Sequence, residues 1–184
     1  MAALYVILTL LALALLWGLL TFNRIIRLTN MRSEAWSGID VQLKRRHDLI
    51  PNLVETVKGY AAHERGLLED IARLRAQSAS AGSIAEKGRA EEALTTSIKT
   101  LFAVAEAYPD LKANTNFLRL QQDLTAVEDE LQLARRYYNG TVREYNTAIL
   151  SFPNLVIAAL MAMRPAEFFS ADTTERATPG MKLS

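Results

Sequence analysis

The chain has 184 residues, enough for one domain with a short accessory segment and too few for two independent cores. Its net charge of +1, from 21 basic and 20 acidic residues, produces no overall field that would attract nucleic acid. The absence of cysteine excludes disulfides and cysteine-ligated metal sites, and the 50% apolar composition with few glycines and prolines favours an all-α fold.

Residues 1–23 are predicted to form a transmembrane anchor. No side chain from Met1 to Phe22 is charged, and a helix of that length spans about 30 Å, the thickness of the hydrocarbon core of a bilayer. A cleaved signal peptide is the alternative, but it requires a basic start and a small-residue cleavage site, and the run has neither. Trp17 and Phe22 are candidate contacts with the membrane interface, where aromatic side chains are enriched.

The first charges after this run are Arg24, Arg27 and Arg32, with none before it. The positive-inside rule therefore predicts an N-terminus outside the cell membrane and a C-terminal domain in the cytoplasm. Arg24 and Arg27 are also candidate membrane contacts. Because three arginines decide the orientation, the reverse arrangement remains the alternative.

Residues 24–151 are expected to form the folded domain, built from amphipathic helices with apolar residues three and four positions apart. The first helix begins near Ala35 without a loop after the anchor, and Pro51 either ends it or starts the second helix. The second runs to about Arg75, and residues 77–83 form a flexible connection. The third carries its inner stripe from Ala90 to Ala105, and the fourth covers residues 110–150.

Four such helices with short connections predict an antiparallel up-and-down bundle around one apolar core. If the first helix leaves the membrane, the fourth returns toward it and places the short apolar segment 152–169 at the membrane surface or the base of the bundle. Phe152 and Leu155 of this segment are candidate membrane contacts. The polar tail, residues 170–184, is predicted to be disordered.

Two blocks of sequence carry a family resemblance: IDVQLKRRHDLIPNLVETVKGYAAHE at residues 39–64, and AYPDLKANTNFLRLQQDLTAVEDELQLARRYYNGTVREYN from Ala107. Both closely resemble the LemA family, and with the anchor the resemblance extends to about Phe169. It implies a bacterial protein of the inner membrane with a four-helix bundle of mirror up-and-down topology behind one transmembrane helix. It implies no enzyme activity and no settled molecular function.

No constellation of residues predicts a catalytic, cofactor-binding or metal site. His47 and His63 are too far apart for a metal pair on one helix turn, and His63-Glu64 lacks the second histidine of a zinc protease. Glu128, Asp129 and Glu130 are consecutive and fan around the helix, unlike a catalytic pair. Phosphate-binding glycine loops and nucleophile elbows are also missing from the sequence.

The densest charge cluster is Lys44, Arg45, Arg46, His47 and Asp48. Successive charges point around the whole helix, so at least one is expected to face the bundle seam. One interpretation is an ion-pair network with carboxylates of the fourth helix, such as Asp123, Glu128 or Glu130. The other is a docking surface for a partner protein or for anionic lipid headgroups.

These observations favour a non-enzymatic, membrane-tethered interaction or scaffold protein that binds a partner protein or copies of itself, and touches membrane lipids through its N-terminal helix. The alternative is a lipid-binding or membrane-remodelling oligomeric coat, suggested by the basic start of the domain and the apolar segment after residue 151.

Overall fold

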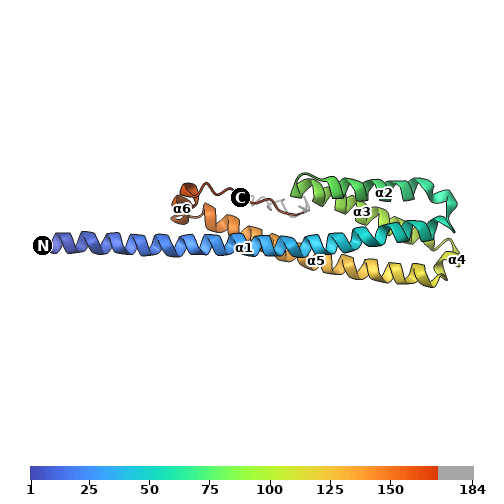
Figure 1. Cartoon of the computed structure of the whole chain (residues 1–184), viewed down its shortest axis with the longest axis horizontal. Helices are drawn as coiled ribbons and strands as arrows, with labels where there is room; N and C mark the ends of the chain where they lie inside the picture. The colour runs from blue at the N-terminus through green and yellow to red at the C-terminus, as the bar shows by residue number, and fades with distance from the viewer. Residues whose placement is uncertain (170–184) are drawn as a thin grey trace, which may run out of the picture. The chain divides into compact units, whose positions relative to one another are not determined.

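The computed structural model of the chain describes residues 1–169, apart from the side chain of Ala62, and every regular element in that range is a helix. The predicted all-α class is therefore confirmed, while the predicted disordered tail lies outside the described residues. Figure 1 shows the elements in chain order. They are α1 (Ala2–Lys58), the short 3₁₀ helix η1 (Ala62–Glu64), α2 (Arg65–Ser80), α3 (Ile84–Ala105), α4 (Pro109–Lys112), α5 (Thr115–Leu150) and α6 (Asn154–Leu160).

The helix boundaries differ from the prediction at three places. Pro51 neither ends nor begins a helix, because α1 continues through it to Lys58 and the chain turns only at Gly59–Ala61. The segment expected as a flexible connection is mostly helical, since α2 extends to Ser80. The last long helix begins at Thr115, after the separate turn α4, because the Asn114 side chain caps it by accepting a hydrogen bond from the Phe117 amide (3.0 Å).

The short link between α2 and α3 is fixed by side chains at the start of α3. The Ser83 hydroxyl accepts a hydrogen bond from the Glu86 amide (3.1 Å), and the Glu86 carboxylate accepts one from the Gly82 amide (3.2 Å). This Ser-x-x-Glu arrangement satisfies amides that the first helical turn leaves without a partner. It allows α2 and α3 to run side by side as a hairpin (Figure 1).

The chain divides into two compact units, each built from segments that are distant in sequence. Of the described residues, unit 1 contains 1–37 and 137–166, and unit 2 contains 38–136 and 167–169. In unit 2 the four long helices contribute to one apolar core, as a four-helix bundle requires. The fully or almost fully buried members of this core include Leu53, Ile71, Leu94, Leu101 and Leu111.

Unit 1 has its own smaller core, in which the α1 segment, the end of α5 and α6 meet. Ile25 and Leu28 of α1 pack with Tyr145 and Ile149 of α5 and with Ala158 of α6. In the same unit, the Trp36 and Tyr138 rings pack edge to face with their centroids 5.3 Å apart.

Candidate functional site

Arg46 is the centre of a buried ion-pair network in unit 2. Its guanidinium contacts the carboxylate of Glu91 on α3 at 3.0 Å and that of Glu128 on α5 at 3.1 Å, and it donates a hydrogen bond to the Thr95 hydroxyl at 2.8 Å. The arginine side chain is only 3% exposed. A planar guanidinium is suited to this task because its fork of donors serves several acceptors at once.

Glu91 is the carboxylate on which the network converges. It is fully buried, and besides Arg46 it contacts the His47 Nε2 at 2.7 Å and accepts a hydrogen bond from the Ser78 hydroxyl. Burial alone would raise the pKa of Glu91, but hydrogen bonds from His47 and Ser78 and the charge of Arg46 outweigh burial and hold the pKa below its ordinary value. Glu91 is therefore an anion at neutral pH.

We call these side chains the Glu91 network; its members are Arg46, His47, Ser78, Glu91, Thr95 and Glu128. They come from all four long helices. A fully satisfied polar network inside a bundle restricts the alignment of its helices, since any sliding separates the charges.

Pro51 is tolerated inside α1 because another residue replaces the hydrogen bond that it cannot make. Proline has no amide hydrogen, so the carbonyl of His47, four residues earlier, loses its helical partner. The Arg75 Nε of α2 donates to this carbonyl at 2.8 Å. The contact from Arg75 of α2 thus allows α1 to continue through Pro51, a residue type that usually interrupts a helix.

Arg135 is a second buried cation in unit 2 and is only partly satisfied. It is 8% exposed, its guanidinium lies over the Phe169 ring at 5.1 Å, and its Nε and Nη2 have no hydrogen-bond partner within residues 1–169. Burial lowers the pKa of Arg135, and the nearby charge of Glu128 opposes that change. The stacking on Phe169 supplies some of the stabilisation that water would otherwise provide.

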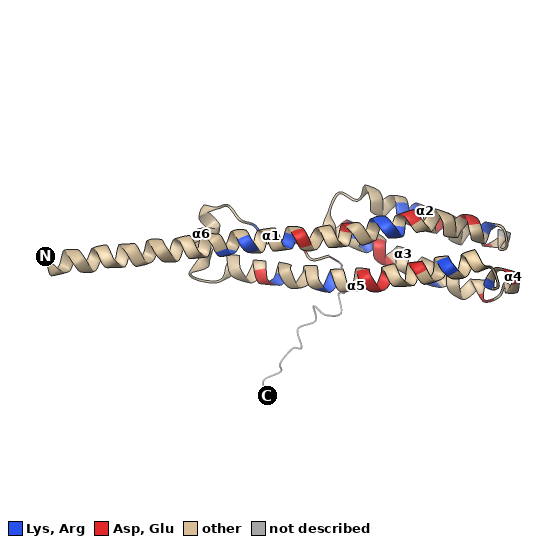
Figure 2. Ribbon diagram, turned by 60° about the horizontal axis from the view of Figure 1, so that its bottom comes forward, with Lys and Arg blue, Asp and Glu red and all other residues tan. Residues whose placement is uncertain are grey.

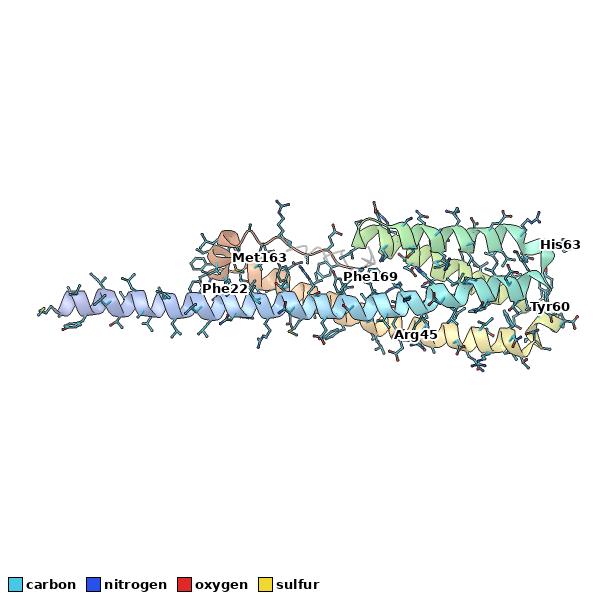
Figure 3. The ribbon with its side chains drawn as sticks, viewed as in Figure 1. Phe22, Arg45, Tyr60, His63, Met163 and Phe169 are labelled. Atoms are coloured by element: carbon cyan, nitrogen blue, oxygen red, sulfur yellow. The ribbon has the colours of Figure 1, made fainter. Side chains whose placement is uncertain are left out.

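The predicted cluster from Lys44 to Asp48 is divided by the fold between the interior and the surface. Arg46 and His47 point inward, and Glu128 is one of the carboxylates that the sequence suggested as a partner. Lys44, Arg45 and Asp48 are exposed, with Arg45 donating to Gln42 at 3.3 Å (Figure 3). The predicted docking surface is therefore reduced to these three side chains, because a buried arginine offers no surface to a partner.

Sequence reasoning missed the main acceptor, Glu91. The prediction placed Ala90, four residues before Leu94, on the buried face of α3. Glu91, three residues before Leu94, lies on the same face and was not considered. Both residues are buried. A carboxylate at a stripe position, opposite a helix with consecutive cations, was the available signal for an internal ion pair.

The described chain contains no group of three or more His, Asp or Glu side chains placed to hold a metal ion. A cavity of about 330 Å³ adjoins the network between α3 and α5, with Thr95, Lys99, Phe102 and Asp129 among its lining residues. His63 lies in η1 and is exposed (Figure 3), so it is not a member of the Glu91 network.

The predicted membrane contacts all lie in unit 1. The N-terminal part of α1 includes a stretch long and apolar enough to cross a membrane, with a mean hydropathy of 2.5 and no residue buried. Figure 2 shows this stretch free of charged residues until the first arginines. Phe22, Phe152 and Leu155 are 43%, 85% and 46% exposed. Trp17 is partly exposed, and Arg24 and Arg27 are exposed.

Comparison with known proteins shows which family the sequence resembles. The magnetosome protein MamQ 1 of Paramagnetospirillum magneticum is 24% identical over 82% of this chain, and MamQ of Magnetospirillum gryphiswaldense is 22% identical over the same share. This chain spans 65% of the length of each of these magnetosome proteins. Protein LemA of Metamycoplasma hominis is 25% identical over 84% of this chain and 71% of its own length. The family model described as LemA family matches residues 35–183, most of the chain, and the chain therefore belongs to the LemA family.

Proposed function

We propose that this chain is a membrane-tethered, non-enzymatic interaction or scaffold protein whose helices dock a partner protein or further copies of the chain. The observation that carries the proposal is that one helix, α1, includes both an apolar span with no buried residue and side chains of the bundle core. A chain segment that supplies both a membrane span and part of a folded core suits a membrane-tethered protein.

The buried charges support a structural role in place of a catalytic one. Glu91 is held as an anion by three partners, so it is poorly suited to exchange a proton near neutral pH. Arg46 is likewise engaged by two carboxylates. The network stabilises the bundle, and the exposed Lys44, Arg45 and Asp48 are the part of the predicted cluster that remains accessible to a partner.

The first test is the mass and shape of the full-length protein in mild detergent, measured by light scattering and electron microscopy on one fraction. We expect either a defined oligomer or a co-purifying protein. A photo-crosslinker at Arg45 should capture the same species, and the exposed Arg73 provides a control position. A strict monomer that captures nothing at Arg45 in cells would overturn the proposal.

We also propose that the bundle faces the cytoplasm, because Arg24, Arg27 and Arg32 follow the span. The natural lack of cysteine allows a clean test. An Ala72→Cys variant, exposed on α2, should react with a membrane-impermeant maleimide only after the cells are permeabilised. An Ala3→Cys variant should react in intact cells, and the opposite pattern would reverse the orientation.

A second candidate function is an oligomeric coat that binds or remodels membranes, favoured by the exposed apolar residues of α6. Full-length protein reconstituted at high density into vesicles would then tubulate or constrict them in electron micrographs. Vesicles that stay spherical at all densities would remove this candidate and leave the tethered scaffold.

A further inference from the structure

The exposed face of α6 is unusually apolar for a surface that touches water. Phe152 and Leu160 are 85% and 81% exposed, and Leu155 and Val156 are 46% and 52% exposed. These four residues fall within nine consecutive positions at and around one short helix. Contiguous exposed apolar side chains of this kind mark a contact with a protein or a membrane.

The other side of α6 packs on α1 at the place where the apolar span gives way to charge. Ile157 and Ala158 of α6 join the unit 1 core with Ile25 and Leu28, and a Cβ added at Gly18 would lie 3.9 Å from Ile157. Gly18 belongs to the uncharged run, whereas Ile25 and Leu28 lie among the first arginines. In Figure 3, Phe22 marks this part of α1 and Met163 the end of the α6 segment. When the span crosses a bilayer, α6 is therefore at the depth of the headgroups.

Specific contacts hold α6 in this position. The Tyr145 hydroxyl donates to the Arg164 carbonyl at 3.2 Å. The Asn146 amide donates to the Ala166 carbonyl (3.0 Å) and accepts from the Ala166 amide (2.8 Å). Ala162 ends the helix with φ of 51°, a left-handed conformation that disfavours any residue with a Cβ. These contacts hold α6 in a defined position, so its exposed apolar side chains form a fixed surface of unit 1.

The charges of unit 1 indicate the kind of surface that it meets. Within residues 1–37 and 137–166 there are five arginines and two glutamates, an excess of three positive charges. Four of these arginines, Arg24, Arg27, Arg143 and Arg164, are exposed. Basic side chains beside apolar ones favour the interface of a membrane that contains anionic lipids.

We propose that α6 is a second membrane contact, which inserts Phe152, Leu155, Val156 and Leu160 into the interfacial layer of the bilayer crossed by α1, while arginines of unit 1 bind anionic headgroups. This contact rests on the proposed membrane tether. It fixes the tilt of unit 1 at the membrane. A single spanning helix leaves its tilt undetermined, whereas a second point of contact restricts it.

The test uses full-length protein in vesicles made of phosphatidylcholine and phosphatidylglycerol in equal parts. Leu160→Cys carries an environment-sensitive fluorophore, and lipids with quenchers at headgroup depth or in the bilayer centre report its position. We expect blue-shifted emission, quenched several-fold more by the headgroup quencher than by the central one. Leu133→Cys, an exposed leucine of unit 2, is the matched control and should report water.

The possible results distinguish a failure of the α6 contact from a failure of the membrane tether. Leu11→Cys, in the span, should be quenched from the bilayer centre, and failure there would remove the tether itself. A water-like spectrum at Leu160, or blue-shifted emission that no lipid quencher reaches because a second copy covers the site, would overturn the α6 contact alone. Exchanging Arg164 for Gln should weaken interfacial partitioning about fivefold, as about 1 kcal/mol per basic residue implies, and vesicles of phosphatidylcholine alone should weaken it further.

Discussion

Removing the Glu91 carboxylate should destabilise the bundle more than any surface substitution. In Glu91→Ala, Arg46 keeps Glu128 but loses its fully buried partner, and His47 and Ser78 lose their acceptor. Breaking a buried ion pair costs about 3–5 kcal/mol. Because Glu128 is 20% exposed and still compensates part of the arginine charge, we expect the lower end, about 3 kcal/mol, which lowers the ratio of folded to unfolded protein more than about 100-fold.

The assay is urea unfolding of the full-length chain in mild detergent, followed by circular dichroism. The Glu92→Ala variant changes an exposed carboxylate next to Glu91 and should alter the free energy of unfolding by less than about 0.5 kcal/mol. A loss below about 1 kcal/mol in Glu91→Ala, with an unchanged urea slope, would refute the view that this network stabilises the bundle.

The lowered pKa of Glu91 predicts how the free energy of unfolding depends on pH. Because the folded state lowers the pKa of Glu91 from its ordinary value of 4.5, its stabilising contribution is present above that value. It is lost as the pH falls through the lower, folded-state pKa. The difference in unfolding free energy between the native chain and Glu91→Gln should therefore stay constant near neutrality and shrink in acid. A difference that instead grows in acid would contradict the assigned direction of the pKa shift.

Three further substitutions test other contacts by the same unfolding assay. Arg75→Ala should lower the free energy of unfolding by about 1 kcal/mol because it leaves the partly buried His47 carbonyl without its donor, and by much less in a Pro51→Ala background, where the backbone supplies a donor. Equal losses in both backgrounds would contradict the view that Arg75 replaces the missing amide of Pro51. Arg135→Met should be neutral or stabilising, since it removes a buried cation with two nitrogens that have no partner in the described part of the chain, and a loss of unfolding free energy above about 2 kcal/mol would contradict this. Ala162→Gly should stabilise the end of α6 by about 1 kcal/mol by relieving its positive φ, whereas a destabilised variant would show that the conformation is not strained.

The sequence predicted what depends on local periodicity and missed what depends on contacts between helices. The stripe of α3 was predicted correctly, with Leu94 and Leu101 completely buried, because burial follows directly from helical spacing. Pro51 was interpreted as a boundary because local rules make it one. The donor that overrides those rules, Arg75, belongs to another helix, and neither residue reveals the other in the sequence.

The candidate sites show the same division. An ion pair between the cluster around Arg46 and Glu128 was one of two interpretations of the charges, but the larger role of Glu91 depends on how α3 is rotated against α1. Rotation about a helix axis is set by the packing of the whole core and is only approximately encoded in a stripe. The exposure of Phe152 and Leu155 agrees with their selection as candidate membrane contacts, a role that stays a prediction.

The hydrogen bond from Arg75 to the His47 carbonyl also has a consequence for biosynthesis. A nascent chain leaves the ribosome with its N-terminus first, so Pro51 emerges before the residues of α2. Until then the His47 carbonyl has no protein donor and hydrogen-bonds to water. The end of α1 therefore acquires its final backbone hydrogen bonding only when α2 folds back against it. One backbone acceptor of the longest helix in the described chain thus gains its partner late in synthesis, from a neighbouring helix.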